Sequence, residues 1–211
     1  VIPVGSGVVS GGMRVFVLGN NFILVFTNVI TATSHLQYVA INSTNPTLIG
    51  SNTDIAAVYI PATTLAWDGY VAAGKLLLAY NTTSGGQAIK VTYLTAGLTL
   101  VTAVTFAASI ATMVSVTADE TNASNPAIYV SFYDLGTTTG YTLAVDQNLH
   151  TLLAPTQIIA SGTALNITSV AQNGICSVAV EVSNTYSFAP GTGTPTNFVD
   201  GITITLASAT V

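Results

Sequence analysis

Residues 164–182 read ALNITSVAQNGICSVAVEV, and this stretch decides the fold class. Asn173-Gly174 is a dipeptide typical of a two-residue β-hairpin loop, and the runs on either side have the length and composition of strands. Counting back from the loop gives one mostly apolar face, on which Ala171 pairs with Cys176, Ser169 with Val178, Ile167 with Val180 and Leu165 with Val182. Asn166 then lies opposite Glu181 on the other face. The stretch therefore predicts an antiparallel hairpin with one buried side.

Strand-length segments recur along the rest of the chain, and none forms a convincing amphipathic helix. They cover residues 13–18, 22–27, 35–41, 54–60, 75–80, 87–94, two segments within 98–118, 127–134 and 202–206. Asp68-Gly69, flanked by aromatic residues, carries a second hairpin signal. The pattern predicts an all-β protein, an antiparallel β-sandwich of Greek-key or jelly-roll-like type, in which residues 13–211 form a single domain.

The first twelve residues, VIPVGSGVVSGG, read as a strand without a local partner. Their alternation places Ile2, Val4 and Val8 on one face, and Gly11-Gly12 is suited to a hinge. We expect residues 1–12 to be a donor strand and hinge, added to the sheet edge of another subunit. A frayed or internally paired terminus is the open alternative.

The composition excludes several classes of protein. Half of the 211 residues are hydrophobic and only 5% are charged, with a formal net charge of -5, so there is no basic patch for nucleic acid. The uncharged run 91–118 is interrupted by threonines and Gly97, which favours strands over a transmembrane segment. The chain begins at Val1 with no methionine, as removal of a signal peptide would leave it. We therefore expect a secreted protein.

Catalytic and metal-binding motifs are lacking in the sequence. His35 and His150 lie in apolar, threonine-rich surroundings that are typical of structural histidines, and Cys176 falls on the inward face of the best hairpin. The scattered carboxylates do not have the spacing of a calcium loop. We expect no enzymatic activity, no cofactor and no metal.

Four N-glycosylation sequons begin at Asn42, Asn81, Asn122 and Asn166. Three lie in predicted turns and the fourth on an outward strand face, where a sugar would cover surface that carries little charge. Asparagine is common in turns without any glycan. We expect glycans on at least two of these sites, on the condition that the chain is exported.

Lys75 and Lys90 suggest a further modification. A lysine beside an Asn or Asp, with a carboxylic acid nearby in an apolar core, can condense to an isopeptide bond. Glu120 and Glu181 are the only glutamates, so few arrangements are available. The alternative is that both lysines are simply solvated at the surface.

Taken together, the processed apolar extension 1–12, the sandwich pattern through 13–211, the scarcity of charge and the sequons resemble the subunits of archaeal thread filaments and, next, archaeal bundling pili. That resemblance implies a single β-sandwich whose groove is completed by the N-terminal strand of the next subunit. It also implies that Ile2, Val4 and Val8 are donor residues and that Asn42, Asn81, Asn122 and Asn166 carry glycans. Type IV-like pilins begin with a long helix, which Pro3 and the glycines near it exclude here.

Two classes of function remain, and a third, a secreted hydrolase with an unrecognised site, is disfavoured by the scarcity of ionisable residues. The first is a structural subunit of a secreted cell-surface filament that polymerises head to tail with itself, in adhesion or biofilm formation. The second is a carbohydrate-binding or adhesive module, for which Trp67, Tyr70 and Tyr80 would supply a stacking platform. A surface-layer or viral coat protein would have the same sequence character as the first.

Overall fold

A computed structural model describes residues 9–30, 33–47, 49–58, 66–82, 88–108, 110–159, 163–184 and 196–205. Within these ranges the chain is all β, with fifteen strands in four antiparallel sheets. The first sheet contains β1 (Val9–Leu18), β2 (Asn21–Ile30), β3 (Thr33–Asn42) and β4 (Thr53–Ala57). The second contains β5 (Trp67–Ala72), β6 (Lys75–Asn81), β7 (Ala88–Thr95) and β8 (Val104–Ala107).

The third sheet contains β9 (Ala111–Asp119), β10 (Ala127–Asp134), β11 (Thr139–Val145) and β12 (Thr151–Ile159). The fourth contains β13 (Thr163–Gln172), β14 (Ile175–Asn184) and β15 (Thr196–Thr205). In every sheet each strand pairs with its neighbours in sequence, so the sheets are simple meanders. The expectation of a sandwich with Greek-key crossovers therefore does not describe the arrangement of these strands. The reason is that each hairpin turns back on its own sheet.

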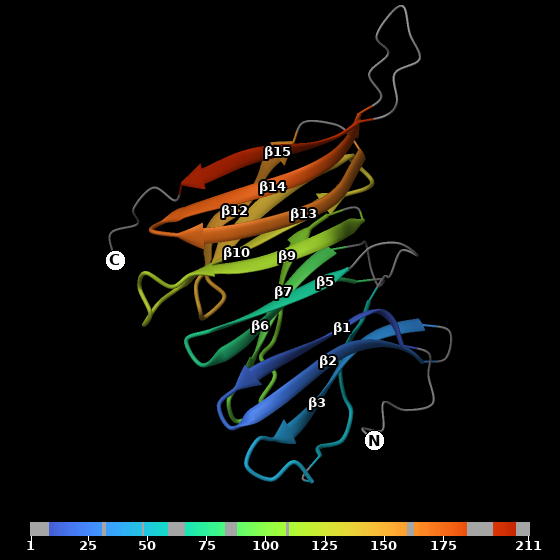
Figure 1. Ribbon diagram of the computed structural model, residues 1–211, viewed down its shortest axis with the longest axis vertical. Helices are drawn as coiled ribbons and strands as arrows, with labels where there is room; N and C mark the ends of the chain where they lie inside the picture. The colour runs from blue at the N-terminus through green and yellow to red at the C-terminus, as the bar shows by residue number, and fades with distance from the viewer. Residues whose placement is uncertain are drawn as a thin grey trace, which may run out of the picture.

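The four sheets are stacked in chain order, with the first strand of each sheet against the first strand of the next. β1 contacts β5, β5 contacts β9 and β9 contacts β13. Figure 1 shows these strands one above another, with the fourth sheet at one end of the molecule and the first sheet at the other. The two middle sheets are thus covered on both faces by neighbouring sheets, whereas each end sheet has another sheet on one face only.

The alternation of side chains along the middle strands explains this stacking. In β6, Leu76 and Leu78 belong to the core between the first and second sheets, and Leu77 belongs to the core between the second and third. In β10, Val130 points toward the second sheet and Tyr129 toward the fourth. Strands that are apolar on both faces must be covered on both sides, and this is the position that both strands occupy.

The hairpin at residues 164–182 is confirmed almost residue by residue. Ala171 pairs with Cys176, Ser169 with Val178, Ile167 with Val180, and Asn166 with Glu181, as the loop predicts. A bulge then shifts the register, so that Val182 pairs with Ala164 and not with Leu165. Cys176 is fully buried on the inward face, as expected for a small apolar side chain.

The second hairpin signal was wrong. Asp68-Gly69 lies inside β5, and the turn comes later, at Ala73-Gly74. Gly69 serves close packing instead: a Cβ there would lie 2.8 Å from Leu78 Cδ2, 3.0 Å from the Leu77 carbonyl oxygen and 3.0 Å from Phe16 Cζ. The dipeptide therefore marks the contact between the first two sheets.

The glycines Gly11-Gly12, expected as a hinge, lie within β1 in the structure. β1 begins at Val9, which pairs with Asn28, and the register shifts between Val9 and Met13 around Gly12, whose φ is 97°. Gly12 thus lies at a bulge within a strand, and residues 1–8 lie outside the described residues, so the donor-strand role of residues 1–12 stays a prediction. Across the run 91–118 the described residues form parts of β7, β8 and β9, and the described chain contains no helix long and apolar enough to cross a membrane.

We predict that Gly69→Ala lowers the free energy of unfolding by about 1–3 kcal/mol, because the new methyl group meets the backbone oxygen of Leu77 as well as two side chains. Urea unfolding measures the change. Gly97→Ala is the control: its Cβ would meet only Thr95 Oγ1, at 3.7 Å, and should shift stability by less than about 0.5 kcal/mol. Equal effects for the two variants would contradict the proposed packing of the first sheet on the second.

Candidate functional site

A row of polar contacts joins the first strands of the four sheets. The Asp68 carboxylate on β5 pairs with Arg14 on β1, and it accepts hydrogen bonds from the N–H of Gly69 (2.6 Å) and the N–H of Val116 on β9 (2.8 Å). Burial raises the pKa of Asp68, although these three partners each oppose that shift. Because the guanidinium of Arg14 also stacks on Trp67, 5.8 Å from the ring centroid, Asp68 and Arg14 are fixed groups of the scaffold.

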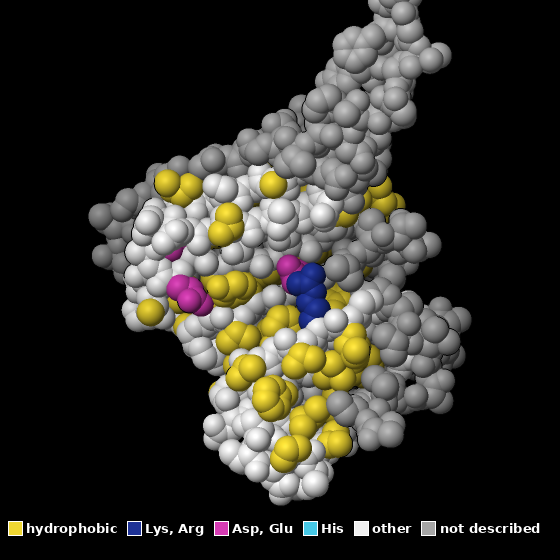
Figure 2. Space-filling view, in the orientation of Figure 1, with side chains coloured by type: hydrophobic (Ala, Val, Ile, Leu, Met, Phe, Trp, Pro, Cys, Tyr) yellow, Lys and Arg dark blue, Asp and Glu magenta, His cyan; other side chains and the backbone are white. Residues whose placement is uncertain are grey.

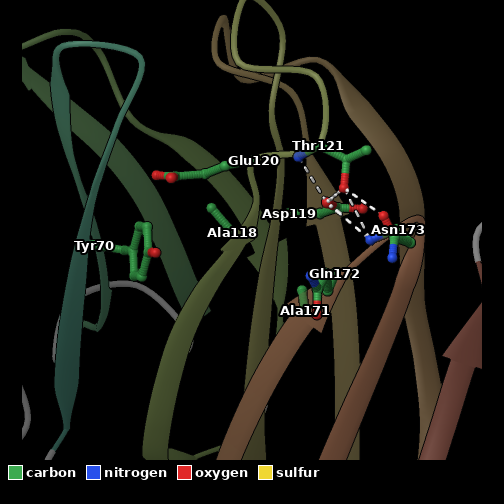
Figure 3. Close-up of a pocket in the computed structure, with 8 residues that line it drawn as sticks. All are labelled: Tyr70, Ala118, Asp119, Glu120, Thr121, Ala171, Gln172 and Asn173. Carbon is green, nitrogen blue, oxygen red and sulfur yellow. Dashed lines mark hydrogen bonds between the residues drawn. The ribbon is translucent and has the colours of Figure 1, made fainter.

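A pocket opens at one end of this row, where β5, β9 and β13 finish. It has a volume of about 460 Å³ and is lined by Tyr70, Ala118, Asp119, Glu120, Thr121, Ala171, Gln172 and Asn173. Tyr70 forms one wall, the turn after β9 forms another, and the end of β13 closes the third side (Figure 3). Its lining therefore comes from three of the four sheets.

Asp119 holds two walls of the pocket together. Its carboxylate accepts hydrogen bonds from the N–H (3.0 Å) and hydroxyl (2.5 Å) of Thr121, from the N–H of Asn173 (3.2 Å) and from the N–H of Gly174. Burial by itself would raise the pKa of Asp119, but the hydrogen bonds from Thr121, Gly174 and Asn173 outweigh it and lower the pKa. Asp119 is therefore an ionised clamp between the β9–β10 turn and the β13–β14 hairpin loop.

Glu120 is the accessible acid of the pocket. Its side chain is exposed and points across the opening toward Tyr70, away from the Asp119 clamp (Figure 3). Burial, with the negative charge of Glu120 adding to it, raises the pKa of Tyr70. Tyr70 therefore remains an O–H donor at neutral pH, and Glu120 is available to accept hydrogen bonds from a ligand.

The aromatic platform expected from the sequence is not formed. Trp67 is fully buried and Tyr80 is 3% exposed, both in the core between the first two sheets. Tyr70 alone of the three lines the pocket. Gln172 and Asn173 were not expected as pocket residues, and Glu120 was considered only for a metal site or a crosslink, because these residues become neighbours of Tyr70 only through sheet stacking. The Asn173-Gly174 turn signal could have drawn attention to the loop.

The asparagines of the four sequons differ in how far their side chains are exposed to solvent. Asn122 and Asn166 are exposed, and Asn42 is half-buried at the edge of an exposed loop. Asn81 is fully buried at the end of β6, so its amide nitrogen cannot carry a glycan in the folded chain. This burial argues against one of the four predicted glycan sites and leaves the other three open.

Both lysines are half-buried, and one lies beside an asparagine. Lys75 Nζ donates to the carbonyl oxygen of Gln147 (2.8 Å) and to Asn148 Oδ1 (3.1 Å), and it lies 4.3 Å from the ring centroid of Tyr93. Lys90 lies on β7, where it pairs in register with Thr105. An isopeptide bond at either lysine stays a prediction, with loss of one ammonia or one water as its signature in the intact mass.

The histidines each contact a carboxylate. His35 Nδ1 lies 3.0 Å from both oxygens of Asp54, and His150 Nδ1 lies 2.9 Å from Asp146 Oδ2. Burial raises the pKa of the Cys176 thiol to about 12, so it is not a nucleophile at neutral pH. Within the described ranges, no group of three His, Cys, Asp or Glu side chains is placed to hold a metal ion. The donor residues Ile2, Val4 and Val8 lie outside the described residues.

The surface is sparsely charged and carries an apolar strip. Met13, Val15 and Val17 on β1 and Phe22 on β2 are all exposed, and they share the outer face of the first sheet. Figure 2 shows hydrophobic side chains gathered over this sheet, with few charged groups on the face in view. The strip lies at the opposite end of the stack from the fourth sheet.

The sequence matches no protein-family model, and no curated protein matches it. Among solved structures, the NanB sialidase from Streptococcus pneumoniae is similar with a TM-score of 0.50 and 14% identity, over 83% of this chain and 29% of the sialidase. An exo-β-1,3-galactanase from Phanerochaete chrysosporium gives a TM-score of 0.49 and 12% identity, over 85% and 48% of the two chains. An α-L-arabinofuranosidase from Podospora anserina gives 0.47 and 12%, over 95% and 65%.

The similarity to the sialidase concerns the fold alone, and the chain spans less than a third of that enzyme's length. Successive meander sheets whose first strands adjoin are the arrangement of blades in a β-propeller, so the fold is propeller-like. The expectation of no enzymatic activity is corrected, because a fold of this kind also occurs in an enzyme, the NanB sialidase. The all-β character of the chain was correctly expected.

We predict that peptide mapping of the native chain by mass spectrometry finds glycan on Asn122 and Asn166, which are exposed, and none on Asn81, which is buried. Asn81 is the internal control, because it has a complete sequon in the same chain. A glycan on Asn81 would contradict the position of β6, and bare asparagine at all four sites would contradict glycosylation itself.

We predict that Asp119→Asn lowers the free energy of unfolding by about 1–3 kcal/mol, because it removes a charged acceptor shared by four donors. The folded pKa lies below the ordinary value of 3.8, so the stabilisation is complete above that pH and is lost as pH falls through the folded pKa. Urea unfolding between neutral and acid pH should show this acid loss in the wild type and less of it in the variant.

Glu120→Gln is the matched control for this prediction, because it removes an adjacent carboxylate that is exposed. Its unfolding free energy should stay within about 0.5 kcal/mol of the wild type. If Asp119→Asn were as stable as Glu120→Gln at neutral pH, the clamp would have no part in stability.

Proposed function

We propose that this chain is a structural subunit of a secreted cell-surface filament, in which the N-terminal strand of one copy adds to the fourth sheet of the next. The observation that carries the proposal is a difference in strand number. Among the described residues the first three sheets each have four strands, whereas the fourth has three. A strand supplied by another copy would bring the fourth sheet to the size of the others.

The open position lies beside β15. In the first three sheets the last strand pairs with the third, and β15 is the third strand of its own sheet. It is ten residues long, and among the described residues no strand pairs with its outer side, which is the side on which an edge strand presents N–H and C=O groups. Such an edge accepts an added strand through main-chain hydrogen bonds, whatever the sequence of that strand.

Residues 1–8 have the properties of the added strand. In an extended conformation eight residues reach about 26 Å, at roughly 3.3 Å per residue, which is enough to lie along most of β15. Ile2, Val4 and Val8 would share one face, and each would contribute roughly 1.5–3 kcal/mol if fully buried. Association and the ordering of the strand offset part of this gain.

Exchange between copies fits the fold better than closure within one chain. Residues 1–8 lead directly into β1, in the first sheet, and the first and fourth sheets lie at opposite ends of the stack (Figure 1). A strand donated to a neighbour would bring that neighbour's fourth sheet toward the first sheet of the donor. The apolar strip of Met13, Val15, Val17 and Phe22 lies on that end sheet and would be covered by the contact.

Other observations agree with a secreted, assembled protein. Charged residues make up 5% of the chain, so its solubility depends on hydroxyl and amide groups, on glycans or on assembly. Asn166 is exposed on β13, at the edge of the fourth sheet farthest from β15, so a glycan there would leave the acceptor edge free. The resemblance to archaeal thread filaments and a role in adhesion or biofilm formation belong to this proposal.

We predict that deleting residues 1–8 abolishes filaments, because no strand is left to fill the edge of β15. Val4→Asp in the full-length chain should raise the concentration needed for assembly by about tenfold or more, since it removes roughly 1.5–3 kcal/mol of apolar burial. Negative-stain electron microscopy and light scattering measure both effects. Thr137→Asp, which places the same charge at an exposed turn between β10 and β11, should assemble normally.

A peptide of residues 1–8, added to the truncated chain, should raise its thermal unfolding midpoint by binding the open edge. Filaments of normal appearance from the truncated chain, or a truncated chain as stable as the full-length one without peptide, would refute the proposal.

A further inference from the structure

We propose that the pocket lined by Tyr70, Glu120 and Gln172 is a binding site for a neutral saccharide. Nothing in the strand-exchange proposal requires this pocket, because its lining comes from the ends of β5, β9 and β13 and the turns that follow β9 and β13. If both proposals hold, a filament of these subunits would adhere to surfaces that carry neutral saccharides.

The size and walls of the pocket fit one or two sugar rings. Its volume of about 460 Å³ falls within the range of roughly 300–1,000 Å³ that is usual for small-molecule sites. The Tyr70 ring offers an aromatic surface for the apolar face of a sugar, and Ala118 and Ala171 leave the space beside it open because their side chains are small. An aromatic wall beside small apolar side chains suits the C–H face of a pyranose.

The polar groups at the rim suit hydroxyl groups, which both donate and accept hydrogen bonds. Glu120 accepts, the Tyr70 hydroxyl donates and accepts, and the exposed Gln172 amide does both. An ammonium or metal cation could use only the acceptors and would leave the amide and phenol donors unmatched. The mixture of donors and acceptors therefore favours a polyhydroxylated ligand over a cation.

The charge of the pocket selects against acidic ligands. Glu120 and Asp119 are its charged lining groups, and neither lysine nor arginine lines it. Asp119 stays ionised because of its four hydrogen bonds, so its negative charge persists at neutral pH while its oxygens hold Thr121 and Asn173 in place. A carboxylated or sulfated sugar would meet two carboxylates without a compensating cation.

The clamp also makes the pocket preorganised. Asp119 joins the turn after β9 to the loop after β13, so the walls that carry Glu120 and Gln172 cannot move apart without breaking its hydrogen bonds. Fewer groups then lose conformational freedom when a ligand binds. A shallow, fixed site of this kind is suited to weak binding that becomes strong when many copies are displayed on one filament.

The test begins with an array of neutral and sialylated oligosaccharides, probed with the full-length chain, followed by calorimetric titration with the neutral glycan that binds best. We expect binding of at least one neutral glycan and weaker binding of its sialylated form. Glu120→Gln and Tyr70→Ala should each reduce the association constant about tenfold or more, because each removes a principal contact. Circular dichroism and thermal unfolding establish that both variants are folded.

Two control variants carry matched changes away from the pocket. Asp54→Asn removes an exposed carboxylate on β4, and Tyr93→Ala removes a half-buried tyrosine on β7, and both should bind the glycan as the wild type does. The proposal is overturned if no neutral glycan binds, or if Glu120→Gln and Tyr70→Ala bind it as well as the controls do. It is also overturned if sialylated glycans, or choline as a probe for cations, bind more tightly than neutral glycans.

The two proposals fail separately. Deleting residues 1–8 leaves every lining residue of the pocket in place, so the truncated chain should still bind the neutral glycan in solution. If the truncated chain no longer assembles but still binds the neutral glycan, both proposals are supported. If the full-length chain assembles but binds no neutral glycan, only the pocket proposal is overturned.

Discussion

The Asp68 carboxylate is the contact on which the stacking of the sheets depends. Within each sheet the strands are hydrogen-bonded to their neighbours in sequence, so what sets one sheet against the next is side-chain packing and a few polar contacts. Asp68 pairs with Arg14 of the first sheet and accepts the N–H of Val116 in the third, while its own strand belongs to the second. Beside it, Ser115 and Ser169 join the third sheet to the fourth through their hydroxyls, 3.1 Å apart.

Buried polar contacts of this kind fix geometry more than they add stability. Burial raises the pKa of Asp68, which means that its ionised form is less favourable in the fold than in water. The apolar layers between the sheets supply the driving force, and the polar row defines how far the sheets slide over one another. The same row brings the ends of β5, β9 and β13 together, so the pocket is a consequence of the stacking.

A feature of the fold could be predicted from the sequence where the residues that determine it lie close together along the chain. The Asn173-Gly174 loop predicted its hairpin register correctly because turn chemistry and alternation both act within a few residues. The alternation of side chains along 127–134 predicted a strand, but alternation does not say which sheet covers each face. For that reason the sequence could not distinguish a two-sheet sandwich from four stacked sheets.

The predictions that failed share one physical origin: they concern residues whose surroundings are formed by parts of the chain that are distant in sequence. Asp68-Gly69 has the composition of a turn, yet the glycine is needed for close packing and the aspartate for contacts to other sheets. Asn81 has a complete sequon, yet the position lies inside the molecule. Glu120, Tyr70 and Gln172 are far apart in the sequence and meet only through the tertiary structure.

An electron cryomicroscopy map of the native assembled material tests the central claim most directly, because it shows what lies beside β15. The account predicts a fourth strand in the last sheet, antiparallel or parallel to β15, with side-chain density that fits residues 1–8 of a neighbouring copy. A map in which the edge of β15 is open to solvent, or is covered by a segment of its own chain, would contradict the account.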